Sequence, residues 1–249
     1  MAGHSQFSNI MHRKGAQDKK RAKIFAKLIR EVTVATRTGM PDPNANPRLR
    51  SAIVACRAAN MPKDNIDRAI KKVAGGDNDE TYDEIRYEGY GPGGSAIIVE
   101  ALTDNRNRTA SDVRTAFAKN GGNLGETGAV SFMFSKKGLI SYPSEVKSAD
   151  DVFEAALSAG AEDVISDQSG HNIYCSVDEL HIVADNLTNV LGDPDAANVI
   201  WHPQNMVKID GINMQKVLIL IESLEDNDDV QRVFSNIEFS ADLMSELMD

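Results

Sequence analysis

The sequence is poor in the residues from which covalent, metal and catalytic sites are built. Its 249 residues include two cysteines, Cys56 and Cys175, which lie far apart and lack the paired spacing of a thiolate metal site. We expect both thiols to be buried as small apolar groups in a reducing compartment. No HExxH, Cys-x-x-Cys or GxSxG motif occurs, and His171, His181 and His202 stand apart from one another. The sequence therefore predicts a protein with no metal, no cofactor and no catalytic site.

Long apolar runs are also missing. No segment approaches the roughly 20 apolar residues that span a bilayer, and the opening MAGHSQFSNI has no apolar stretch of the secretory type. We therefore expect a cytoplasmic protein without a membrane partner. No sequence feature specifies an oligomeric state, and we start from a monomer. The length allows two or three compact domains.

Positive charge is scarce overall and concentrated at one end. The chain has 27 Lys and Arg against 37 Asp and Glu, a net charge of −10. Residues 1–75 hold 16 of the basic and 5 of the acidic side chains, net +11, which leaves 11 basic and 32 acidic residues, net −21, in the other 174. Such asymmetry indicates a polyanion-binding region carried on an acidic body. The alternative is that the two parts neutralise each other across an internal interface.

The basic region predicts an arm followed by three amphipathic helices, together forming residues 1–79. Residues 1–15 contain no acid and little periodicity. From residue 17, apolar residues recur at three- and four-residue steps as far as Gly39, a helix-ending residue. Asn46 with Pro47 predicts the start of a second helix, and Pro62 that of a third. We expect a small bundle with a cationic surface.

The predicted nucleic-acid contacts are the cations of this arm and bundle, together with two arginines further along the chain. Arg106 and Arg108 lie in the stretch TDNRNRT between a predicted strand and a predicted helix, whose N-terminus would favour a phosphate. The alternative is a capped turn in which Asp104 pairs with an arginine. The candidate contacts are His4, His12, Arg13, Lys14, Lys19, Lys20, Arg21, Lys23, Lys27, Arg48, Arg50, Arg57, Lys63, Arg68, Lys71, Lys72, Arg106 and Arg108.

Strands and helices alternate through the acidic body. Residues 138–202 have the β-α-β-β-α-β order of a ferredoxin-like domain. Two further β-α-β units flank this set, and they include predicted strands at 130–134 and 206–209. We expect residues 80–135 and 206–238 to form one ferredoxin-like domain, residues 136–205 to be inserted as a second, and residues 239–249 to be an acidic tail. The predicted class is α+β, an N-terminal three-helix domain followed by two ferredoxin-like α/β domains.

Three local patterns in this body lead to narrower expectations. The stretch GYGPGG lacks the Lys-Ser/Thr of a phosphate loop, so it predicts a tight hairpin with positive φ. Val130, Phe132 and Phe134 alternate, which favours a core-facing strand over an RNA-binding sheet face. Carboxylates such as Asp226, Asp228 and Asp229 are expected in solvated loops.

Six stretches occurring in order resemble the YebC/PmpR family, which includes the mitochondrial translational activator of cytochrome c oxidase. They are MAGHSQFSNIMHRKGAQDKKRAKIFAKLIREV, NPRLRSAI, NMPKDNIDRAIKK, YEGYGPGG, TDNRNRT and GGNLG. The resemblance implies a three-domain protein with a non-enzymatic role in gene expression. It extends the arm contacts to His4, His12, Arg13, Lys14, Lys19, Lys20 and Arg21. Gln6 and Phe7 replace a typical Lys-Trp pair, and Met11 replaces a common Lys.

The expected function is that of a non-enzymatic, DNA-binding transcriptional regulator held on nucleic acid by phosphate contacts. An alternative implied by the same family is a ribosome-associated translation factor that binds ribosomal RNA and relieves stalls at proline-rich stretches. A more distant alternative is an enzyme or small-molecule sensor that uses a cleft between domains. Phosphate contacts position a protein without reading sequence, so specificity must come from shape or from a partner.

Overall fold

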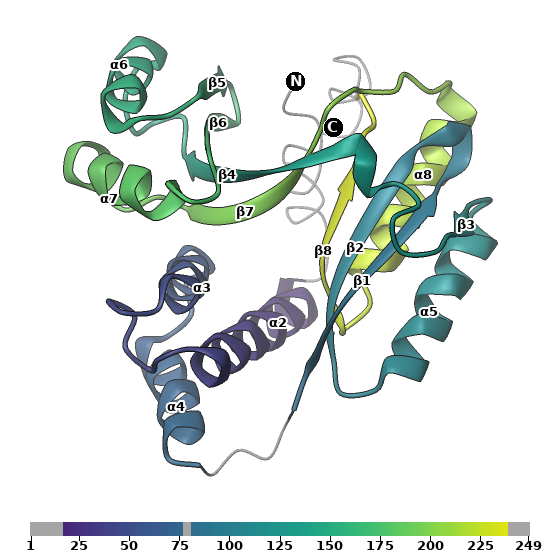
Figure 1. Cartoon of the computed structure of the whole chain (residues 1–249), viewed down its shortest axis with the longest axis horizontal. Helices are drawn as coiled ribbons and strands as arrows, with labels where there is room; N and C mark the ends of the chain where they lie inside the picture. Colours follow the sequence, from purple (N-terminus) through teal and green to yellow (C-terminus); the bar gives the residue numbers. More distant parts are fainter. Residues whose placement is uncertain (1–16, 77–80, 239–249) are drawn as a thin grey trace. The chain divides into compact units, whose positions relative to one another are not determined.

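A computed structural model describes residues 17–76 and 81–238 of the chain (Figure 1). Three helices come first, α2 (Gln17–Thr38), α3 (Pro47–Ala58) and α4 (Lys63–Ala74), and two four-stranded sheets with their helices follow. The predicted α+β class, with N-terminal helices and two α/β parts, is confirmed. Residues 17–23, 81–135 and 201–238 belong to a first compact unit, and residues 24–76 and 136–200 to a second. The predicted arm and acidic tail lie outside the described residues.

The three helices pack through the apolar stripes that their periodicity predicts. Val32, Leu49, Cys56 and Ile66 are buried in this small core. Burial raises the pKa of the Cys56 thiol to about 11, so the thiol stays protonated and packs as an apolar group, as expected.

Asn46 confirms the predicted start of α3 and also ties this helix to α2. Its Oδ1 accepts from Leu49 N at 3.1 Å, which caps the helix. Its Nδ2 donates to the carbonyls of Ala35 at 2.7 Å and Met40 at 2.8 Å. A single buried amide therefore ends one helix and begins the next.

The first sheet has the strand order β3-β1-β2-β8. Its strands are β1 (Asp83–Tyr90), β2 (Ala96–Thr103), β3 (Asn123–Leu124) and β8 (Val230–Ser235). Helices α5 (Arg106–Lys119) and α8 (Gly211–Glu225) share a buried core with one face of the sheet. The turn between β1 and β2 holds Gly93 at φ 69° and Gly94 at φ 76°, so the predicted tight hairpin is confirmed.

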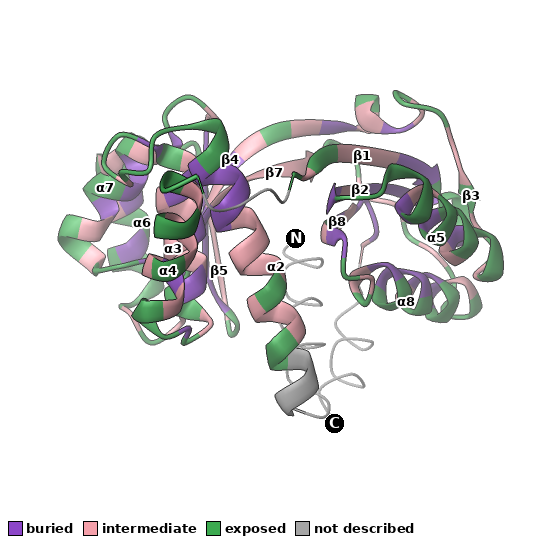
Figure 2. Cartoon of the chain, turned by 90° about the horizontal axis from the view of Figure 1, so that it is seen from below, coloured by how far each residue is buried: buried purple, intermediate pink, exposed green. Residues whose placement is uncertain are grey.

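The second sheet has the strand order β5-β6-β4-β7. Its elements, in chain order, are β4 (Phe134–Tyr142), α6 (Ala149–Ala159), β5 (Asp163–Asp167), β6 (Gly170–Cys175), α7 (Leu180–Leu191) and β7 (Ala196–Pro203). This is the β-α-β-β-α-β order expected for the inserted domain. Its core joins both helices to the sheet, and buried residues gather on the helix surfaces that face the strands (Figure 2).

Two predicted strands of the first sheet are wrong, and its element order differs from the expected one. Residues 131–133 form the short 3-10 helix η2 (Ser131–Met133), which leaves Phe132 66% exposed. In place of a strand at 206–209, only a single bridge joins Val207 to Ile237. The sheet opens with the hairpin of β1 and β2, so its order is β-β-α-β followed by α-β. Only the second sheet therefore follows the ferredoxin-like order.

A buried carboxylate explains the turn at η2. Glu88 on β1 is 1% exposed, and its Oε2 accepts from Val130 N at 3.0 Å and Ser131 N at 2.8 Å. These two N–H groups point at the carboxylate and are not available to a strand ladder. Burial alone would raise the pKa of Glu88, but the backbone N–H groups and Arg86, whose Nε lies 2.9 Å from Oε1, hold it below its ordinary 4.5.

We expect Glu88→Gln to lower the free energy of unfolding at pH 7 by about 1–3 kcal/mol, because the turn loses its charged acceptor. A carboxylate with a lowered pKa stabilises the fold above its unfolded pKa, and this contribution is lost as the pH falls through the folded pKa. The difference between wild type and variant, measured by urea unfolding from pH 7 to pH 3.5, should therefore shrink below about pH 4.5. Glu126→Gln, in an exposed loop, is the control. A difference that stays constant with pH would contradict the assignment.

Candidate nucleic-acid interface

The predicted contacts fall into groups with different surroundings. Six lie outside what the structure describes: His4, His12, Arg13 and Lys14 entirely, and Lys19 and Lys20 of α2 in their side chains. Further along α2, Arg21 is exposed and Lys27 is half-buried. Lys23 Nζ lies 2.8 Å from Asp226 Oδ1 within the first unit.

Helix α4 carries a group of solvent-exposed cations. It turns Ile66, Ala69 and Ile70 toward the bundle core, and its outer surface presents four exposed cations. These are Lys63, Arg68, Lys71 and Lys72.

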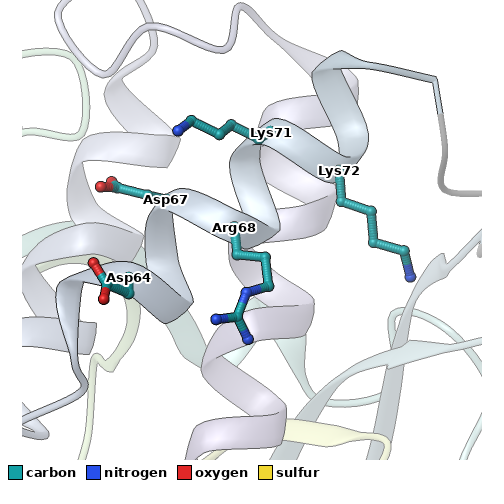
Figure 3. Close-up of a pocket in the computed structure, with 5 residues that line it drawn as sticks. All are labelled: Asp64, Asp67, Arg68, Lys71 and Lys72. Carbon is teal, nitrogen blue, oxygen red and sulfur yellow. The ribbon is translucent and has the colours of Figure 1, made fainter.

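A shallow surface hollow lies along this helix. It is lined by Arg68, Lys71 and Lys72 together with Asp64 and Asp67 (Figure 3). The two carboxylates and Lys71 extend to one side of the helix, and Lys72 extends away from them (Figure 3). Within the part of the chain that the structure describes, no carboxylate lies at ion-pair distance from Lys63, Arg68 or Lys71.

The three arginines of α3 are all paired with carboxylates. Arg48 donates two hydrogen bonds to Glu31 of α2, from Nε to Oε1 at 2.7 Å and from Nη2 to Oε2 at 3.1 Å. Its role is to join two helices of the bundle. Arg50 and Arg57 instead meet acids on α7 and just after it. Arg50 Nη1 lies 3.1 Å from Asp185 Oδ2, and Arg57 Nη1 lies 3.9 Å from Asp193 Oδ2.

Arg106 and Arg108 lie in a capped turn, the arrangement expected as the alternative to a phosphate site. Asn105 Oδ1 accepts from Arg108 N at 3.0 Å and caps α5. Arg106 pairs with Asp83 at 2.9 Å. Arg108 Nη2 lies 2.7 Å from Asp104 Oδ1 and 2.6 Å from Asp229 Oδ2. Hydrogen bonds to Asp229, which has the larger effect, and to Asp104 raise the pKa of Arg108, so the guanidinium in this turn stays charged.

Asp229 is the centre of the hydrogen bonding in this turn, and the expectation that it lies in a solvated loop is wrong. It is 3% exposed, and its Oδ2 also accepts from Thr109 Oγ1 at 2.7 Å and Thr103 Oγ1 at 3.1 Å. The carboxylate thus joins the end of β2, the start of α5 and the segment leading into β8. The run of acids around residue 226 suggested solvation, and no local pattern distinguishes Asp229 from its exposed neighbours.

Within residues 17–76 and 81–238, no group of three or more His, Cys, Asp and Glu side chains is placed to hold a metal ion. None of the helices in that part of the chain combines the length and apolar character needed to cross a membrane.

Asp229→Asn should lower the free energy of unfolding by about 1–3 kcal/mol, because two buried hydroxyls and a guanidinium share a charged acceptor that becomes a neutral amide. Asp228→Asn, at the exposed neighbouring position, should stay within about 0.5 kcal/mol of wild type. Urea unfolding followed by circular dichroism measures both. Equal effects at the two positions would show that the turn does not depend on the buried carboxylate.

Comparison with known proteins covers nearly all of the described chain. Residues 5–76 match a family model described as the TACO1/YebC protein N-terminal domain. Residues 82–237 match the transcriptional-regulator model described as the TACO1/YebC second and third domain. Among solved structures, the chain is similar to a conserved hypothetical protein, Aq1575, from Aquifex aeolicus. The two share 48% identity and a TM-score of 0.86, over 93% of this chain and 96% of the other.

Proposed function

The chain belongs to the TACO1/YebC family, and on that premise we propose that it is a non-enzymatic regulator of gene expression that binds nucleic acid. The family model over residues 82–237 is named for transcriptional regulation, which supports a regulatory role at the level of the family. The finer proposal is a cytoplasmic, DNA-binding transcriptional regulator. Its contacts are phosphate contacts from the basic region.

The exposed cations of α4 are the observation that carries this proposal. The first 75 residues have a net charge of +11, and on α4 that excess reaches the surface as Lys63, Arg68, Lys71 and Lys72. Ammonium and guanidinium groups on one exposed helix bind a phosphate backbone by displacing its counterions. Such contacts supply affinity and carry no base specificity.

The second candidate is a ribosome-associated translation factor. It is favoured because the sequence has no close helix-turn-helix match and because the exposed cations of α4 are suited to phosphates. A structured RNA offers a fixed arrangement of phosphates, which can supply specificity through shape. An enzyme or small-molecule sensor remains the third class, and a ligand-specific rise in melting temperature in a metabolite screen would favour it.

Replacing Lys63, Arg68 and Lys71 with Gln should weaken binding and reduce the slope of log K against log salt by about one for each cation, or about three in total. Fluorescence anisotropy with a 30-base-pair duplex and with purified ribosomes, between 50 and 200 mM salt, measures both quantities. The matched control is Arg114→Gln, Lys119→Gln and Lys216→Gln, three exposed cations of the acidic body. Equal losses in the two triple variants would remove α4 from the interface.

Sucrose-gradient sedimentation of cell extract separates the two targets. Co-migration with ribosomal particles that is lost at high salt would identify the ribosome as the target. Protein confined to the top of the gradient would favour the DNA-binding regulator, and promoter footprinting would then locate its sites.

A further inference from the structure

Arg50 is held in an unusual way for a surface cation. Its Nε donates to Pro43 O at 3.1 Å and its Nη2 to Asn44 O at 3.0 Å, so the loop before α3 fixes two of its three nitrogens. The third nitrogen, Nη1, donates to the carboxylate of Asp185 on α7, at 3.1 Å from Oδ2 and 3.3 Å from Oδ1. If Asp185 left, the guanidinium would keep its orientation and present one edge to solvent.

A second arginine repeats this contact with the same part of the inserted domain. Arg57, seven residues and thus about two turns after Arg50 on α3, lies 3.9 Å from Asp193, just after α7. Residues 176–196 contain five carboxylates and no Lys or Arg. One side of α3 therefore faces an acidic surface within the second unit.

We propose that Asp185 and Asp193 act as an internal competitor, occupying Arg50 and Arg57 until a nucleic-acid phosphate backbone displaces them. This inference rests on the proposed function. Carboxylate and phosphate oxygens accept the same charge-assisted hydrogen bonds from a guanidinium, so one can replace the other without moving the arginine. The side chains of Asp185 and Asp193 are 63% and 72% exposed, and exposed ion pairs open at little cost.

The ion pair of Arg48 with Glu31 is not part of this competition. It lies within the helical bundle, has two short hydrogen bonds and is less exposed, at 35% and 29%. It therefore holds α3 on α2 whether or not nucleic acid is bound. The α4 cations make the first contact with the polyanion, and Arg50 and Arg57 join only after Asp185 and Asp193 are displaced.

Asp185→Asn with Asp193→Asn should raise affinity for a 30-base-pair duplex or for ribosomes about 2- to 30-fold at 100 mM salt, the range expected for removing two exposed competing pairs. The control is Asp150→Asn with Glu154→Gln, which removes the same charge from exposed positions on α6, outside residues 176–196. Circular dichroism melting of each variant checks that the fold is retained. An equal gain in the control would mean that only net charge matters, and would overturn the inference.

A mutant cycle tests the assigned partner directly. In an Arg50→Gln background, Asp185→Asn should raise affinity no more than the single-charge control Glu154→Gln does. The reason is that the arginine that Asp185→Asn would release is no longer present. A gain that persists in that background would also overturn the inference. If wild type binds in a salt-dependent way and the aspartate variants gain nothing, the inference alone fails. If neither wild type nor any variant binds duplex or ribosomes, the proposed function fails with it.

Discussion

Pairing between arginines and the chain's own carboxylates determines what the basic region can do. A cation placed against a buried carboxylate belongs to the fold, because removing either partner leaves an uncompensated charge or unsatisfied hydrogen bonds. Arg108 with Asp229, which is 3% exposed, is of this kind. A cation placed against an exposed carboxylate is only loosely held. Burial of the acid, more than the position of the base, separates structural cations from those that remain exchangeable.

The same distinction explains how two regions of opposite charge coexist in one chain. Residues 1–75 carry +11 and the rest −21, and complete mutual neutralisation would leave no surface for a polyanion. Among the described residues, no carboxylate lies at ion-pair distance from Lys63, Arg68 or Lys71 of α4, although Asp64 and Asp67 lie on the same helix. Both interpretations of the charge asymmetry thus apply, to different helices: the arginines of α3 pair with carboxylates of the chain, whereas Lys63, Arg68 and Lys71 of α4 pair with no described carboxylate.

Local signals predicted most of the fold, and long-range contacts account for what they missed. Asn46, Pro47 and Gly39 mark helix ends, and apolar periodicity identifies the helices and the inserted β-α-β-β-α-β set, since all of this information lies within a few residues. The turn at η2 depends on Glu88, 42 residues from Val130. Asp229 meets Thr109 across 120 residues, and Arg50 meets Asp185 across 135. Local sequence patterns cannot identify partners that lie so far apart along the chain. Composition therefore predicted a cationic region but not which of its cations are paired.

An acidic competitor also changes which anions a basic helix selects. Asp185 and Asp193 each offer one arginine a single carboxylate, whereas a duplex presents a phosphate charge about every 1.7 Å along its axis and gains entropy from released counterions. A small anion that replaces one carboxylate forms an ion pair of nearly the same strength as the one it breaks, so it gains little free energy. An extended backbone that engages α4 first brings further phosphates to α3 at high effective concentration, so the second exchange is intramolecular. The proposed competition from Asp185 and Asp193 would therefore lower affinity for small anions more than for long ones, and would favour a polymeric ligand without any contact to a base.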